Sequence, residues 1–284
     1  QRSCINCHRS NGVAPMSLER YEDARRYARR IASRTEIRDR MGAMPPWYAE
    51  KDIGIQHYKN DPSLTDAEIA MIAQWVEEGA PEGDVADLPP ALEFDDSGAW
   101  TLGEPDVVVT TEEFLVRAEE PDWWGDISPV LIPIEEDRYV KSVEIREIND
   151  VPSEGSGRET VGGRFVIHHM VWGTRNEEGR GVRQTWPVHE VGRNGDLFDQ
   201  EAGRLLTRGS YIVSESTHLH SNGRDTRASL QFGFTFHPKG YEPKYRESLL
   251  GLGNGSDIDI RAGEKDQELH AYTVLQSPTK IVSF

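Results

Sequence analysis

The sequence predicts a small helical domain followed by an antiparallel β-sandwich of the jelly-roll type. Three observations support this fold class. Apolar residues recur at helical spacing up to about residue 88, a stretch rich in proline and acidic residues follows, and beyond it apolar and polar residues alternate. A chain of 284 residues can bury two modest cores. We therefore expect domains at 1–88 and 105–284, joined by a linker at 89–104.

Two helices are predicted in the first domain. The second has the clearer start, because Thr65 and Glu68 form a T-x-x-E capping box, and we expect it to run to Gly79. The first follows "SNGVAPM", where Ser17 can act as its N-cap. Its apolar positions at helical spacing are Leu18, Tyr21, Ala24, Ala28 and Ile31.

Strands with period-two alternation are predicted beyond the linker. Glycine, asparagine and proline turns such as "SEGSG" and "NEEGRG" separate them. Because no amphipathic helices lie between the strands, an antiparallel sandwich or jelly roll is favoured. The runs are "DVVVTTEEFLV" (106–116), "RYVKSVEIREI" (138–148), "RFVIHHMVWGT" (164–174), "ASLQFGFTFHP" (228–238) and "HAYTVLQSP" (270–278).

The charge balance restricts the partners. The chain has 49 acidic and 32 basic side chains, a net charge of -17, which repels phosphate backbones and anionic lipid. We therefore expect no nucleic acid partner. No run approaches the roughly 18 apolar residues that a membrane helix needs, so no membrane span is expected in this chain.

Both cysteines of the chain lie in "CINCH", where His8 directly follows Cys7. C-x-x-C-H is the attachment sequence of haem c, in which Cys4 and Cys7 would bind the haem vinyl groups and His8 the iron. A thioredoxin-like pair belongs near a βαβ pattern, which is absent, and a zinc site of this kind normally has more cysteines. The sequence therefore predicts a cytochrome c-like domain. Since haem c is attached outside the bacterial cytoplasm, we expect an exported protein, periplasmic or extracellular, whose signal has been removed or precedes Gln1.

The segment "RMGAMPPWYAE" between the predicted helices offers a second axial ligand. A methionine thioether in that position raises the haem potential and favours electron transfer. Met44 is the preferred candidate, because Pro45 and Pro46 would hold its backbone in a stiff, extended loop. Met41 and Met16 are the alternatives, each also explained as core packing.

Histidines in the β domain suggest a second metal. His168 and His169 are adjacent in a predicted strand, so only a local bulge or bend would let both reach one point. The alternative is one buried histidine and one at the surface. His218 and His220 are two residues apart and would share a face of an extended segment. Imidazoles without cysteine or carboxylate suit copper or zinc.

The order of the motifs "CxxCH…MPPW", "HHMVWG", "HLHSNG" and "FTFHPKG" resembles bacterial relatives of the copper type II, ascorbate-dependent monooxygenases. That family includes peptidylglycine α-hydroxylating monooxygenase and dopamine β-monooxygenase. In it, one jelly-roll domain holds an electron-transferring copper through a His-His pair and a later histidine. A second holds the oxygen-activating copper. The resemblance implies copper ligands at His168 and His169, with His218 preferred over His220 as the third.

The second copper site is not expected in this chain. The resemblance places its motif after a strand "TKIVSF", which contains Phe284, and no methionine follows Met170. We expect a portion of a longer polypeptide, with a sandwich incomplete at its C-terminal side, and assign no catalytic residue.

The predicted function is electron transfer from haem c to a histidine-ligated copper, as part of a monooxygenase that hydroxylates C–H bonds with O2. The expected partner is an electron donor or another redox protein. The main alternative is a non-catalytic cytochrome subunit of a larger redox complex. A zinc hydrolase with Glu215 or Asp225 as base would leave the haem without a purpose.

Overall fold

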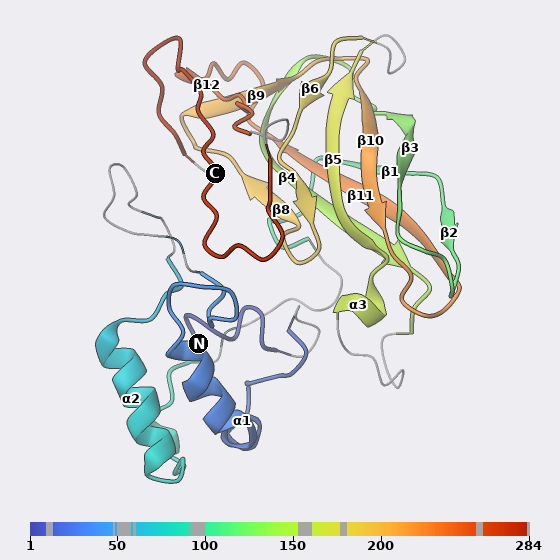
Figure 1. Ribbon diagram of the computed structural model, residues 1–284. Coiled ribbons are helices and arrows are strands. Elements are labelled where there is room, and N and C mark those ends of the chain that lie inside the picture. Colours follow the sequence, from blue (N-terminus) through green and yellow to red (C-terminus); the bar gives the residue numbers. More distant parts are fainter. Residues whose placement is uncertain are drawn as a thin grey trace.

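Strands make up most of the regular structure, in two layers, and the helices α1 and α2 lie on the N-terminal side (Figure 1). Among the residues described below, no helix is both long and apolar enough to cross a bilayer. The computed structural model describes residues 1–9, 14–47, 49, 58, 61–90, 92, 100–152, 161–176, 181–253 and 258–282.

Helix α1, Tyr21–Thr35, begins later than predicted. Ser17 does not cap it; the N-cap position is Arg20, whose side chain makes no capping hydrogen bond. The Ser17 hydroxyl instead accepts the backbone N–H of Glu19 at 3.1 Å and donates to the Glu19 carboxylate at 2.9 Å. Because the Ser17 hydroxyl is engaged in this local turn, it does not accept a backbone N–H of α1, and the predicted N-cap is wrong.

Helix α2, Asp66–Glu77, confirms the predicted capping box. Thr65 accepts the backbone N–H of Glu68, and the Glu68 carboxylate accepts the backbone N–H of Thr65 at 2.7 Å. Gly79 ends the helix in the left-handed region, at φ 87°. The hydroxyl of Tyr21 donates to the carbonyl of Ala80 at 2.8 Å, which joins the start of α1 to the end of α2. The short helices are η1, Val85–Asp87, and α3, Val161–Arg164.

The strands form two sheets, and their pairs are antiparallel except for β12 on β9. The first sheet has the order β1-β11-β4-β9-β12, with β2 on β11 and β8 on β4. The second has the order β3-β10-β5-β6, with β7 on β5. The bounds are β1 Val107–Thr110, β2 Phe114–Val116, β3 Trp123–Leu131, β4 Arg138–Asn149, β5 Ile167–Arg175, β6 Gln184–Thr185, β7 His189–Glu190, β8 Gly195–Leu197, β9 Ala202–Leu206, β10 Tyr211–Leu219, β11 Thr226–Phe236 and β12 Tyr245–Arg246.

The two sheets pack around one shared core. Trp172 of β5 stands at its centre, with Phe232 of β11 at a ring-centroid distance of 5.1 Å and Trp186 at 5.5 Å. All three side chains are fully buried. The Trp172 indole N–H donates to the carbonyl of Pro187 at 2.7 Å, so its polar atom is satisfied inside the core. Aromatic rings from both sheets thus join the layers into a β-sandwich.

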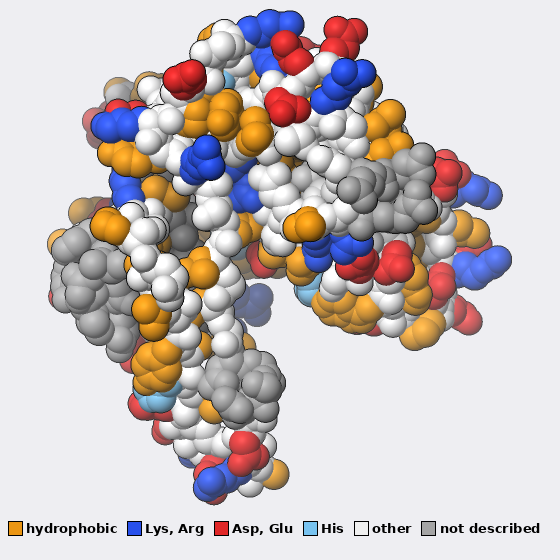
Figure 2. Space-filling view, turned by 90° about the horizontal axis from the view of Figure 1, so that it is seen from above, with side chains coloured by type: hydrophobic (Ala, Val, Ile, Leu, Met, Phe, Trp, Pro, Cys, Tyr) orange, Lys and Arg blue, Asp and Glu red, His pale blue; other side chains and the backbone are white. Residues whose placement is uncertain are grey.

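The predicted strand at 270–278 is wrong. This segment has no strand, and its apolar side chains are open to solvent, with Tyr272 84% and Val274 75% exposed. Hydrophobic side chains also lie open, among charged ones, on the face in Figure 2. Alternation decides which face a side chain takes, but a strand also needs a neighbour for its backbone hydrogen bonds. Residues 279–282 of "TKIVSF" likewise form no strand, and its last two residues lie outside the described part.

The end of the expected linker packs on the first sheet. The backbone N–H groups of Thr101 and Leu102 donate to the buried carboxylate of Glu144 in β4, at 3.0 and 2.9 Å. The guanidinium of Arg146 lies 4.7 Å from the centre of the Trp100 ring. The sandwich therefore includes the chain from Trp100 onward, and most of the remaining linker, 93–99, is outside the described residues.

Candidate metal centre

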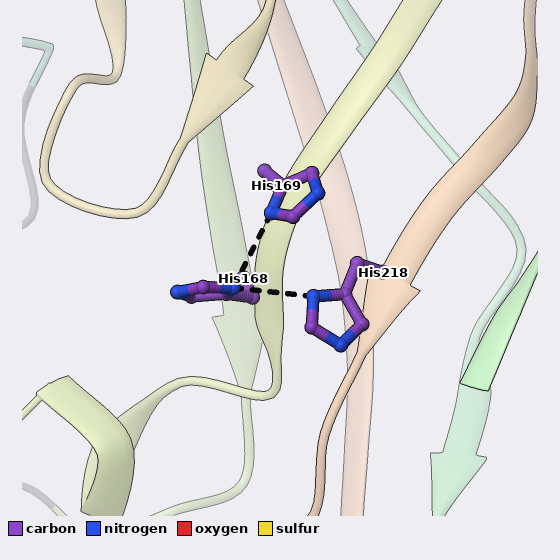
Figure 3. Close-up of side chains that lie close together, drawn as sticks. All are labelled: His168, His169 and His218. Atoms are coloured by element: carbon purple, nitrogen blue, oxygen red, sulfur yellow. Dashed lines mark hydrogen bonds between the residues drawn. The ribbon is translucent and has the colours of Figure 1, made fainter. Parts of the chain in front are cut away.

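His168, His169 and His218 converge on the outer face of the second sheet. One ligand atom of each lies within 4.8 Å of the others. Nδ1 of His168 lies 3.1 Å from Nδ1 of His218 and 3.3 Å from Nδ1 of His169 (Figure 3). Strand β5 supplies the adjacent pair and β10 the third ring. We call these three residues the histidine cluster.

A β-bulge at His168 lets two adjacent histidines reach the same point. On β5 and β10, His169 pairs with His218, but the next pair is Ile167 with Leu219. His168 is therefore an extra residue on its strand, and such a residue is turned away from the regular alternation. This is the local bend that a shared site for the adjacent pair requires.

The carboxylate of Glu147 in β4 fixes the backbone just before the bulge. It accepts the backbone N–H of Val166 at 3.1 Å and that of Ile167 at 2.9 Å, and also the side-chain amide of Asn149 at 2.7 Å. Burial raises the pKa of Glu147, while these hydrogen bonds act in the opposite direction. Glu147 thus connects the first sheet to the strand that carries the adjacent histidines.

Two residues of the β3 region hold the ring of His218. Nε2 of His218 lies 3.2 Å from a carboxylate oxygen of Asp122. The indole of Trp124 is stacked on the same ring, with centroids 4.5 Å apart and planes at 3°, and its edge contact with His169 is at 4.7 Å. A neutral imidazole that donates from Nε2 has its lone pair on Nδ1. Asp122 therefore favours the tautomer in which Nδ1 of His218 can bind a metal.

The spacing of the nitrogens suits one ion. Nitrogens bound to a shared ion at about 2.0–2.1 Å with near-tetrahedral angles lie about 3.3 Å apart. The distances within the histidine cluster, 3.1 and 3.3 Å, are close to this value. Burial lowers the pKa of His169, and the neighbouring His218 and His168 lower it further, which favours the neutral form that a metal needs. A site of imidazoles alone suits copper or zinc.

His220 lies outside the histidine cluster. Its Nε2 is 3.3 Å from the backbone carbonyl of Phe165, and its ring lies beside that of His168 with centroids 5.4 Å apart. The group of ligand atoms within 4.8 Å of one another contains His218 instead. Of the two candidates for the third ligand, the geometry favours His218.

The other described histidines of the β domain stand apart from the cluster. His189 is buried, with 4% of its surface exposed, and burial lowers its pKa to about 4. His237 is stacked on Tyr241 at 3.9 Å, and His270 lies beside Tyr272 on the surface. These three rings are packed in the protein or lie at its surface, and none belongs to the histidine cluster.

The C-x-x-C-H segment forms one tight turn. The backbone N–H of Cys7 donates to the carbonyl of Cys4 at 3.1 Å, and that of His8 to the same carbonyl at 2.8 Å. Neither cysteine forms a disulfide, and burial raises the pKa of the Cys4 thiol. Nδ1 of His8 lies 3.1 Å from the carbonyl oxygen of Met16. A ligating histidine commonly donates its other N–H to a carbonyl in this way, so this contact fits a role of His8 as an axial ligand.

Met44 is anchored to the end of α1. Its backbone N–H donates to the carbonyl of Arg34 at 3.0 Å, and its side chain is 40% exposed, compared with 86% for Met41. Met16 is partly buried, and its carbonyl is the partner of the His8 ring. The indole Nε1 of Trp47 is buried and has no hydrogen-bond partner among the described residues. An unpaired buried donor beside the methionine loop is consistent with a missing polar partner such as a haem propionate.

Sequence patterns did not indicate Asp122, Trp124 or Glu147. None is part of a ligand-spacing motif, and Asp122 is 96 residues from His218 in the chain. "PDWWG" does place two tryptophans in an otherwise polar region, which was the available signal. The contact of Trp124 with the histidine cluster follows from the strand register, in which Trp124 pairs with His218.

Comparison with known proteins does not identify a family. The chain matches no family model, and no curated protein matches its sequence. A functional assignment therefore depends on the geometry and the motifs of the chain itself.

Proposed function

We propose that the chain is an exported redox protein that passes electrons from haem c to a mononuclear copper, as part of a copper-dependent monooxygenase. The C-x-x-C-H segment would carry the haem, and His168, His169 and His218 would hold the copper. The observation that carries the proposal is the convergence of three Nδ1 atoms, 3.1 and 3.3 Å apart, in the same chain as a haem attachment sequence.

On the haem side, Cys4 and Cys7 would form the thioether bonds and His8 would be the first axial ligand. Haem c supplies reversible one-electron transfer, and a methionine as second ligand raises its potential. Met44 is the proposed second ligand, because its backbone is fixed to the end of α1. Helices α1 and α2 would then belong to a cytochrome c-like domain. Since bacteria attach haem c outside the cytoplasm, the proposal includes export.

On the copper side, the surrounding residues would orient the imidazoles for the metal. Asp122 orients the ring of His218, Trp124 covers one face of that ring, and Glu147 fixes the strand ahead of the bulge. Copper supplies one-electron redox chemistry, and imidazole is among the ligands that suit it. The protein's part is to orient the ligands and to restrict access of water.

The monooxygenase assignment comes from the resemblance in motif order to the copper type II family. A His-His pair followed by a later histidine is that family's arrangement for its electron-transferring copper. We propose the matching jelly-roll topology for this sandwich. Among the described residues, the histidine cluster is the one group of side chains that could hold a metal. Hydroxylation of a C–H bond is therefore proposed for the assembly, in which an electron donor or another redox protein would be the partner.

The zinc hydrolase is disfavoured by the positions of its candidate bases. Glu215 forms an ion pair with Arg175 at 2.8 Å. Asp225 accepts the backbone N–H of Ala118 at 2.9 Å. Both carboxylates are thus engaged away from the histidine cluster, and neither is in place to activate a metal-bound water.

Metal analysis of the whole protein tests the proposal. After export and haem attachment, we expect one haem iron and one copper per chain. His168→Ala should lose the copper and keep the haem spectrum, because it removes the central nitrogen of the cluster. His220→Ala is the matched control and should keep both metals. Full copper in His168→Ala would contradict the ligand assignment, and haem without copper in the parent protein would favour a cytochrome subunit.

A further inference from the structure

We propose that a cavity between β2 and β3 binds a small organic cation, an ammonium group on an apolar stem. The cavity has a volume of about 260 Å³. It lies where the chain crosses from the first sheet to the second, so both sheets contribute to its walls. The inference does not depend on haem or copper. The lining residues are 112–116, 120, 121, 123, 126–128, 217 and 219.

The inner part of this β2–β3 cavity is apolar. Phe114 and Leu219 pack against both hydrophobic clusters of the sandwich, and Val116 is 3% exposed. Ile127 of β3 adds a further aliphatic wall. Such a surface favours an alkyl chain over a fully hydrated ion.

The outer part is acidic. Four carboxylates line the cavity, and no Lys, Arg or His is among its described lining residues. Glu113 is paired with Arg227 at 3.0 Å, and Glu120 accepts the backbone N–H of Arg117 at 2.9 Å. Glu112 and Asp126 supply the remaining two negative charges. A cleft with one sign of charge on low-dielectric walls concentrates the opposite charge, here a cation.

An aromatic wall adds a second attraction for a cation. The indole of Trp123 lines the cavity and is 43% exposed. It lies against the backbone of Gly125, where an added Cβ would come within 1.7 Å of a ring atom. Glycine at this position therefore permits the ring to lie along β3. Indole is the side chain with the strongest cation–π attraction.

These three features together select the class of ligand. The carboxylates repel an anion, and a neutral apolar molecule would cover them without supplying a counter-charge. A hydrated metal ion would gain nothing from the apolar interior. The charged group of a primary alkylammonium can pair with the carboxylates of the outer part, while its chain of a few carbons packs on the apolar inner part. The size of such a molecule suits the volume of the cavity.

Calorimetric titration of the full chain with n-hexylammonium tests the inference, with n-hexanol as the neutral probe of the same shape. We expect saturable binding of the ammonium, at least about tenfold tighter than any binding of the alcohol. The double variant Glu112→Gln, Asp126→Asn should weaken ammonium binding about tenfold. Asp259→Asn with Glu264→Gln removes the same charge far along the chain and should leave the affinity unchanged.

Three results would overturn the proposal: no saturable ammonium binding, equal affinity for ammonium and alcohol, or equal weakening in the two double variants. Urea unfolding of each variant shows whether it is folded. Repeating the titration on protein freed of copper separates this inference from the proposed function, since the cavity should bind equally well without the metal.

Discussion

His189 shows how burial alone sets the chemistry of a single residue. It lies in β7 opposite Met170 of β5, and its Nδ1 has no hydrogen-bond partner among the described residues. Burial lowers its pKa to about 4, and the nearby positive charge of Arg193 acts in the same direction. The ring is therefore neutral in the folded protein across a range in which an exposed histidine is charged.

We predict that this residue makes the protein less stable as the pH falls from 6.5 to 4. In the unfolded chain His189 protonates near 6.5, whereas in the folded protein it resists protonation until about 4. The unfolded state thus binds more protons in this window. The free energy of unfolding therefore decreases as the pH is lowered from 6.5 to 4, by about 3 kcal/mol in all. Urea unfolding at a series of pH values measures this dependence.

His189→Gln should flatten the curve between pH 6.5 and 4, while His270→Gln, an exposed control, should not. An unchanged slope in His189→Gln would show that the ring is already charged or exposed.

At the same scale, the sequence indicated the candidate ligands but not the residues that position them. The adjacent pair and the H-x-H segment are short local patterns, so His168, His169 and His218 could be selected in advance. The order of the motifs preferred His218 over His220, and the ring positions agree with that preference, which residue spacing alone could not supply. Asp122 could not be predicted, because its contact with His218 arises from the pairing of β3 with β10.

At the scale of elements, the capping box predicted the start of α2, but Ser17 did not predict the start of α1, and pairings between distant segments could not be predicted. The capping box at Thr65 lies within one turn of chain, and α2 begins where it predicts. The prediction of a strand at 270–278 was wrong, because alternating polarity does not show whether a neighbouring strand is available for backbone hydrogen bonds. The bulge at His168 is a similar case, since it depends on the register with β10.

We predict that Thr65→Ala destabilises α2 by about 1 kcal/mol, because it removes the side-chain acceptor of the Glu68 backbone N–H. Thr65→Ser keeps a hydroxyl at the same position and should retain most of the stability. Hydrogen exchange of the amides in α2 measures the effect locally. Equal exchange rates in the alanine and serine variants would mean that the capping hydrogen bond contributes nothing.

At the scale of the whole molecule, the sandwich is self-contained. Its main hydrophobic cluster consists of residues from Val107 onward. Where both partners are described, no hydrogen bond or ion pair joins 1–90 to 100–282, whereas Trp100, Thr101 and Leu102 are attached to β4. Figure 1 shows α1 and α2 lying apart from the two layers of strands. The change from helical to alternating periodicity made this division predictable, but its position at residue 100 depended on Glu144.

We therefore predict that a fragment starting at Trp100 folds without the first 90 residues and takes up as much of the proposed copper as the full chain. The reason is that the shared core and every described residue that contacts the histidine cluster lie within it. Circular dichroism and urea unfolding measure the fold, and metal analysis gives the copper content. A fragment starting at Gly103 is the matched control: it keeps Asp106 and its hydrogen bonds to β11, but lacks the two amides that satisfy the buried Glu144 carboxylate, and should be less stable by about 1–3 kcal/mol. If the longer fragment fails to unfold cooperatively, or folds but takes up no copper, then the sandwich depends on the helical part in a way that its contacts do not show.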